Sequence, residues 1–200
     1  MSKLSLSTRM ILVLTLITIM SGGILAGWDM YTKPKVEYHR EQALQAAIAE
    51  VLPPYDHYDI LETDLGTLYI GKAEDSITTV GAAFMAIGSG FQGEIRIMVG
   101  YAPEKDALTG IKVLEQIETP GLGTKIVTDP SNKEDPLWWP AQFKGVSVKP
   151  EIVVLKNATP TKDNEIQGIT GATISSKAVA TIINDRLAEV QDVLKQGGKN

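Results

Sequence analysis

The hydrophobic pattern of the chain begins with one long uninterrupted run. Residues 10–28 carry no charge and are mostly Ile, Leu, Val and Met. As a helix this run would be about 28 Å long, which is enough to cross a bilayer. A cleaved signal peptide is the alternative, but its apolar region is usually shorter, and the nearest cleavage candidate, Ala26, has the bulky Ile24 two positions before it. We therefore predict an uncleaved transmembrane anchor.

Beyond this run, the apolar positions recur at helical spacing in some stretches and at strand spacing in others. Residues 39–52 place apolar side chains on one helical face before Pro53 and Pro54, and residues 179–194 repeat apolar positions at helical spacing. Between them we expect a hairpin and further strands, at residues 58–73, 77–87, 94–101, 111–117 and 146–155. This order predicts an α+β fold, in which one N-terminal transmembrane helix precedes a single domain with a mostly antiparallel sheet and flanking helices.

The same pattern divides the chain into five parts. We predict an N-terminal tail at residues 1–9, an anchor at 10–28, a tether around Pro34 at 29–38, the folded domain at 39–195 and a C-terminal tail at 196–200. Lys3 and Arg9 precede the anchor, whereas a flank of mixed charge follows it. The positive-inside rule then places the N-terminus in the cytoplasm and the folded domain on the outer face of the membrane.

Composition narrows the chemistry of the chain. Of its 200 residues 44% are hydrophobic and 22% are charged, and the net charge is -5. Because Lys and Arg form no cluster, we exclude nucleic acid as a partner. Without cysteine the chain has no disulfide, cysteine-bound zinc or iron–sulfur cluster of its own. His39 and His57 are isolated, so we predict no catalytic residue and no metal ligand.

One stretch, residues 168–180, concentrates hydroxyl groups at the start of the last predicted helix. It reads G-I-T-G-A-T-I-S-S-K-A-V-A, with Thr173 expected just ahead of the helix. The first amides of a helix lack partners and lie at the positive end of its dipole, so a phosphate can bind there without a basic side chain. The structural alternative is that Ser175 or Ser176 only caps the helix. The residues alone leave both interpretations open.

A second stretch, residues 118–125, reads E-T-P-G-L-G-T-K and follows a predicted strand. Pro120 restricts the backbone, whereas its two glycines permit positive φ angles and the close approach of a planar ligand. As a bare sequence it predicts a turn. Further along, Trp138 and Trp139 are interpreted either as a cover over the core or as a shield for such a ligand.

Taken together, these stretches resemble a known family. Residues 170–173 (T-G-A-T), followed by I-S-S, resemble the flavinylation motif of the FMN-binding domain in the G subunit of Rnf-type electron transport complexes, and in the related C subunit of sodium-pumping quinone reductases. The sequence G-F-Q-G at residues 90–93, a strand, a hairpin and then E-T-P-G-L-G occur in the family's order. The resemblance covers most of residues 80–190. Where the family usually has an aspartate ahead of the motif, this chain has Gln167.

The resemblance implies an electron carrier with covalent FMN, attached by a phosphoester between the ribityl phosphate and the Thr173 hydroxyl. The chain would be a redox subunit of an enzyme complex that couples ferredoxin and NAD oxidoreduction to sodium or proton movement, in the cytoplasmic membrane of a bacterium or archaeon. Its partners would be other subunits, including flavin and iron–sulfur subunits, and a flavin transferase for maturation. The cofactor-binding residues carried over are Thr173, Glu118, Thr119, Leu122, Gly123, Thr124, Gly171 and Ala172.

Two alternatives stand beside this hypothesis. The domain could be the C subunit of a sodium-translocating NADH:quinone reductase, although that subunit is usually longer than this chain. It could also be an anchored binding or scaffold module, in which the threonine motif only begins a helix and no cofactor is attached.

Overall fold

The computed structural model describes residues 5–63, 66–75 and 78–197. The chain divides into two compact units, Met1–Ala43 and Leu44–Asn200, and helix α1 (Leu6–Val51) contributes to both. The sequence predicts a tether at residues 29–38, whereas these residues are helical, Pro34 included. Because good helix formers such as Lys, Glu, Arg and Gln surround Pro34, the helix continues despite losing one backbone hydrogen bond there.

The N-terminal part of α1 is apolar on all sides. It contains an 18-residue window with a mean hydropathy of 2.2, none of which is buried, so the helix is long and apolar enough to cross a membrane. Leu14 and Ile19, for example, expose 68% and 67% of their surface. A helix that is apolar all round is stable in lipid, whereas water solvates such a surface unfavourably. This part of α1 agrees with the predicted anchor.

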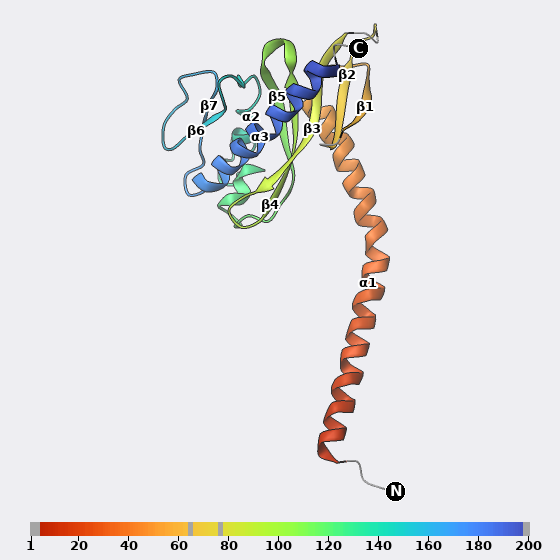
Figure 1. The fold of residues 1–200 in the computed structure, drawn as a ribbon. Coiled ribbons are helices and arrows are strands. Elements are labelled where there is room, and N and C mark those ends of the chain that lie inside the picture. Colours follow the sequence, from red (N-terminus) through yellow and green to blue (C-terminus); the bar gives the residue numbers. More distant parts are fainter. Residues whose placement is uncertain (1–4, 64–65, 76–77, 198–200) are drawn as a thin grey trace. The chain divides into compact units, whose positions relative to one another are not determined.

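The second unit is built on a five-stranded sheet in which the strands follow chain order and every neighbouring pair is antiparallel (Figure 1). Its strands are β1 (His57–Thr63), β2 (Gly66–Lys72), β3 (Thr79–Ser89), β4 (Glu94–Ala102) and β5 (Ala107–Gln116). The predicted hairpin at 58–73 is confirmed as β1 and β2, although residues 64 and 65 of its turn, like residue 77 of the next predicted strand, lie outside the described residues. The mostly antiparallel sheet is thus confirmed.

Strand β5 starts earlier than the sequence predicts, at Ala107 in place of Ile111. The connection from β4 is short because the 3-10 turn η1 (Pro103–Lys105) reverses the chain, and Asp106 completes the reversal in the left-handed region with φ 46°. The sequence suggested a longer turn because residues 107–110 have no clear alternation of apolar and polar positions.

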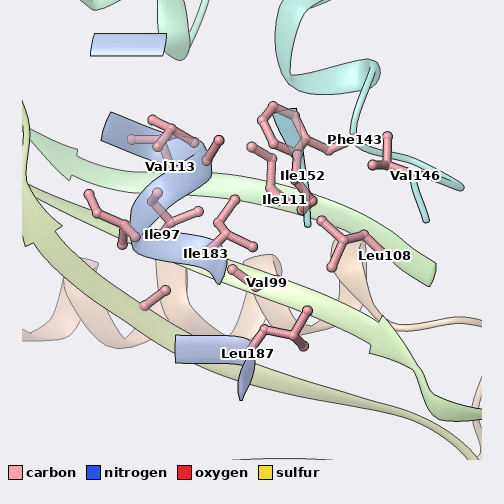
Figure 2. Packing of buried hydrophobic residues seen from close by; sticks show 14 of the residues in the cluster. Ile97, Val99, Leu108, Ile111, Val113, Phe143, Val146, Ile152, Ile183 and Leu187 are labelled. Carbon is pink, nitrogen blue, oxygen red and sulfur yellow. The ribbon is translucent and has the colours of Figure 1, made fainter. Parts of the chain in front are cut away.

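Helices cover both faces of the sheet. Helix α3 (Thr173–Gly197) packs on one face, where Figure 2 shows Ile183 and Leu187 beside Ile97 and Val99 of β4. The last turns of α1 pack on the opposite face, in a cluster with Met98. Met98 lies between Ile97 and Val99 in β4, and neighbouring side chains of a strand point to opposite faces. The two flanking helices predicted from the sequence are therefore confirmed.

Residues 117–172, between the sheet and α3, contain only short elements. These are η2 (Gly123–Ile126), α2 (Trp138–Ala141), β6 (Val153–Leu155) and β7 (Glu165–Gln167), of which β6 and β7 form a small parallel pair. The strand predicted at 146–155 is wrong over most of its length, since only its last three residues are in a strand. Before them, Ser147 makes a single bridge to Ala107, and Pro150 has no N–H to donate to a ladder.

The two tryptophans of this segment have different surroundings. Trp139 is fully buried, its ring lies edge-on to Phe143 at 5.1 Å between centroids, and its indole Nε1 donates to the carbonyl of Gln167 at 2.9 Å. Trp138 is half-buried and donates to Asp129 Oδ2 at 3.3 Å. Of the two sequence interpretations, the structure favours a core role for Trp139.

Candidate functional site

The site is built around the first turn of α3. Thr173 is the first residue of this helix and is half-buried, so it does not lie ahead of the helix as expected. Both serines that the sequence offers as caps lie inside the helix. Ser176 Oγ accepts from the Ile169 amide and donates to the Ala172 carbonyl, both at 3.0 Å, so it secures the preceding turn.

The hydroxyl of Thr173 is available for chemistry. Among residues 5–63, 66–75 and 78–197, no group forms a hydrogen bond with it. It stands at the start of a 25-residue helix, where the first amides have no partners within the helix and the dipole favours negative charge. An anionic group joined to this hydroxyl would therefore be stabilised by the helix start alone.

Glu118 connects this helix start with two loops. Its carboxylate is buried, with 4% of the residue exposed, and Oε2 accepts from Ser175 Oγ at 2.5 Å. Its other oxygen, Oε1, accepts from the Gln92 amide at 3.0 Å, in the loop between β3 and β4. Three segments that are far apart in the sequence thus meet at one carboxylate.

The glycines of both loops make room for that carboxylate. A Cβ on Gly90 would lie 2.4 Å from Glu118 Oε1, and a Cβ on Gly123 would lie 2.7 Å from Glu118 Oε2. Contacts this short do not occur with real side chains, so any larger residue at either position would displace Glu118. The glycines in G-F-Q-G and G-L-G are therefore required for packing as well as for their turns.

The loop after Glu118 is a tight turn, as its composition predicts. The carbonyl of Thr119 accepts from the amides of Leu122 and Thr124, and Thr124 Oγ1 accepts from the Gly121 amide. Gly121 has φ 75°, which a residue with a side chain rarely adopts. This turn presents Leu122 towards the threonine motif, because its Cδ2 lies 3.2 Å from where a Cβ on Gly171 would be.

The structure therefore brings most of the predicted site residues together, with different surroundings. Leu122 and Gly171 are exposed at the meeting point of the two motifs, Thr119 and Thr124 are half-buried, and Ala172 is buried in the core. Gly123 packs against Glu118.

Sequence reasoning missed several residues of the site. It considered Ser175 only as a cap and gave Gln92 no role. It also overlooked three large apolar side chains that remain exposed on the segments meeting at Glu118, namely Phe91, Ile117 and Ile174 at 58%, 68% and 60%. Ile174 carries a usable signal, since it is a large apolar residue next to Thr173 and lies off the helical spacing of the buried Val179 and Ile183.

A cleft in the described part of the chain lies elsewhere. It measures about 300 Å³ and runs between β5, η2 and α2, with Thr109, Lys112, Val127, Leu137 and Lys144 in its lining. None of the predicted site residues lines it. The polar convergence at Glu118 and the free hydroxyl of Thr173, and not the size of a cavity, locate the candidate site.

These residues fit FMN. A phosphate can sit at a helix start beside a free hydroxyl without a basic side chain, and the apolar side chains around Glu118 suit a flat, largely apolar ring. The model of the FMN-binding domain family matches residues 90–188, a range that holds both glycine loops and Thr173. The chain is thus a protein with an FMN-binding domain.

The curated relatives narrow the class further. The G subunit of the Na(+)-translocating ferredoxin:NAD(+) oxidoreductase complex of Acetobacterium woodii is 31% identical over 92% of this chain and 91% of its own length. The G subunit of an ion-translocating oxidoreductase complex of Methanosarcina acetivorans is 25% identical over 88% and 90%. The chain belongs to this family, the G subunits of ion-translocating oxidoreductase complexes.

Solved structures also resemble the chain. NqrC of Shewanella oneidensis aligns with 69% of this chain and 66% of its own, at 18% identity and a TM-score of 0.47. A likeness this distant does not discriminate between functions, so the assignment to the family rests on the sequence relatives.

Proposed function

We propose that this chain is a membrane-anchored electron carrier whose FMN is bound covalently, through a phosphoester to Thr173. It would act as one redox subunit of a complex that couples ferredoxin:NAD oxidoreduction to sodium or proton translocation. The observation that supports this most is the free hydroxyl of Thr173 at the start of α3, beside the glycine turn of residues 119–124.

Each part of the site has a task in this proposal. Thr173 Oγ1 carries the phosphate, and the first amides of α3 neutralise part of its charge. Gly121 and Gly123 let the backbone of the turn approach the cofactor closely, and Leu122 offers it an exposed apolar contact. FMN supplies the one- and two-electron redox chemistry, while the protein supplies attachment, orientation and exclusion of water.

Covalent attachment suits a domain on the outer face of the membrane. A dissociated cofactor would be diluted there, away from the cytoplasmic pool, and a phosphoester prevents that loss. The charges of Lys3 and Arg9 ahead of the anchor favour this orientation. Maturation requires a flavin transferase, and electron exchange requires other subunits that carry flavins or iron–sulfur clusters, because this chain has no cysteine to hold a cluster.

The experiment that tests the attachment is in-gel ultraviolet fluorescence of the denatured full-length chain, made together with a flavin transferase, followed by mass spectrometry of the peptide holding Thr173. We expect a fluorescent band with one FMN on Thr173 and a dark band for Thr173→Ala. Thr181→Ala is the matched control, since it makes the same change at an exposed position on the same helix and should keep its fluorescence.

The outcome separates two causes of failure. Fluorescence that persists in denatured Thr173→Ala would overturn the assignment of the attachment residue. If the native chain is dark but Gln167→Asp fluoresces, the transferase fails to recognise the native motif. The main chain of Gln167 is already held by Trp139 and Gln142, so this substitution is expected to preserve the fold. If both are dark, the scaffold alternative is favoured.

A further inference from the structure

Both carboxylate oxygens of Glu118 already have donors within the protein, and the burial of the residue leaves a ligand little access to them. One carboxylate oxygen accepts from Ser175 Oγ and the other from the Gln92 amide, and only 4% of the residue is exposed. We propose that Glu118 is a positioning residue, which holds the Thr173 end of α3 and the loop of residues 90–93 in one arrangement without contacting the cofactor. This inference rests on the proposed attachment of FMN to Thr173, and it replaces the cofactor contact that the family resemblance implies for Glu118.

The bond to Ser175 sets the rotation of the first turn of α3. Residues of an α-helix are about 100° apart around its axis, so Ser175 and Thr173 are about 200° apart. Ser175 is 2% exposed and points at the buried carboxylate, which turns Thr173 towards the opposite, accessible side. A first turn that could rotate or fray would present the Thr173 hydroxyl in many directions.

The bond to Gln92 fixes the loop on the other side of the carboxylate. Within this loop, the Gly90 amide donates to the Gly93 carbonyl at 2.7 Å, which closes a tight turn. Only the glycine at position 90 leaves space for Oε1. The backbone of Phe91, whose side chain is 58% exposed, is thereby held in place together with the start of α3.

The buried carboxylate of Glu118 depends on its hydrogen bonds with Ser175 and Gln92. Within the described part of the chain, no Lys, Arg or His forms an ion pair with Glu118. A buried carboxylate without a cation depends on hydrogen-bond donors, and losing one donor leaves the charge poorly solvated. The carboxylate therefore favours the single arrangement in which Ser175 and Gln92 both reach it.

The test uses the full-length chain and a flavin transferase, and compares Glu118→Ala, Ser175→Ala and Glu118→Gln. The rate of covalent FMN incorporation is followed by in-gel fluorescence, and amide hydrogen exchange of residues 90–93 and 172–176 is measured on the chain before FMN is attached. Glu115→Gln is the control, because it removes the same charge three residues earlier from a side chain that is 40% exposed.

We expect Ser175→Ala to slow incorporation about tenfold, the effect of one lost charge-assisted hydrogen bond. Glu118→Ala, which loses the bonds to both Ser175 and Gln92, should slow it at least as much. In Glu118→Ala the amide of Gln92 should exchange about tenfold faster. Glu118→Gln should recover much of the rate, since its side-chain oxygen can accept from Gln92 and its amide can donate to Ser175 Oγ. Glu115→Gln should react at the native rate.

Two results would overturn the inference. If Glu118→Ala exchanges the Gln92 amide and the amides in the first turn of α3 at the native rate, the carboxylate holds neither segment. This conclusion does not depend on whether the same preparation takes up FMN. If Glu118 instead contacts FMN directly, Ser175→Ala should incorporate FMN at the native rate, and Glu118→Gln should change the absorption spectrum of the flavin. If neither the native chain nor Gln167→Asp takes up FMN, only the proposed function is refuted, because amide exchange still decides the role of Glu118.

Discussion

The antiparallel sheet and the segment of residues 117–172 satisfy their backbone groups in different ways. In the sheet, each strand pairs with its neighbours along a ladder, and apolar side chains fill the space under α3. In the segment, side chains often form the hydrogen bonds with backbone groups that a neighbouring strand would form in a sheet. Asn184 of α3, for example, accepts from the Ile152 amide at 3.1 Å and donates to the Ile152 carbonyl at 3.0 Å.

This difference shows how a region with little regular structure remains ordered. Buried backbone groups need partners wherever they are, and side-chain amides, carboxylates and indoles can provide them. Trp139 does so for Gln167, and Asn164 Nδ2 does so for the carbonyl of Glu151. The segment should therefore be more sensitive than the sheet to the loss of single polar groups, and the following changes test that.

The largest effect is expected for Trp139→Ala. It removes a fully buried ring and also leaves the Gln167 carbonyl without its indole donor, so the free energy of unfolding should fall by roughly 3–5 kcal/mol. Urea unfolding of the detergent-solubilised chain, followed by circular dichroism, measures it. The half-buried Trp138 is the control, and Trp138→Ala should cost clearly less; equal losses would mean that Trp139 does not anchor the segment.

A smaller effect is expected for Asn184→Ala. Ile152 is 3% exposed, so both of its backbone groups would lose their partner in a buried place, at a cost of about 1–3 kcal/mol in the free energy of unfolding. Asp185→Ala, at the next and exposed position of α3, should change this free energy by less than about 0.5 kcal/mol. If the two variants have equal free energies of unfolding, the bonds from Asn184 to the Ile152 backbone do not stabilise the segment.

The smallest effect is expected for Asp129→Asn, and it depends on pH. Hydrogen bonds from Ser131, then Lys125 and Trp138, lower the pKa of the Asp129 carboxyl below its ordinary value. A lowered pKa means that the charged carboxylate stabilises the fold at neutral pH, and that this contribution is lost as the pH falls below about 4 towards the folded-state pKa. The difference in unfolding free energy between the native chain and Asp129→Asn should therefore shrink on acidification.

Asp163→Asn provides the control for that experiment, because it makes the same change at an exposed position. Its unfolding free energy should follow that of the native chain across the same pH range. A difference for Asp129→Asn that stays constant from neutral to acid pH would contradict the role given to its carboxylate.

Much of the fold could be predicted because it is encoded locally. The sheet strands β1 to β4 and the helix α3 each have a run of residues long enough to show a period. β6 and β7 have three residues each, too few for any period, and their parallel pairing depends on contacts across the segment. The helix through Pro34 was missed for the opposite reason, since a local rule about proline was outweighed by the helix propensity of its neighbours.

The sequence by itself indicated the anchor, as an uncharged apolar run at residues 10–28, and its resemblance to the FMN-binding family indicated Thr173 as the candidate attachment residue. Both could be recognised because each lies in one continuous stretch. Only the tertiary structure decided what surrounds that residue. Glu118 reaches Ser175 across 57 positions and Gln92 across 26 positions. No local pattern specifies such a junction, because a buried carboxylate finds its donors only when the sheet, the loop and α3 pack together.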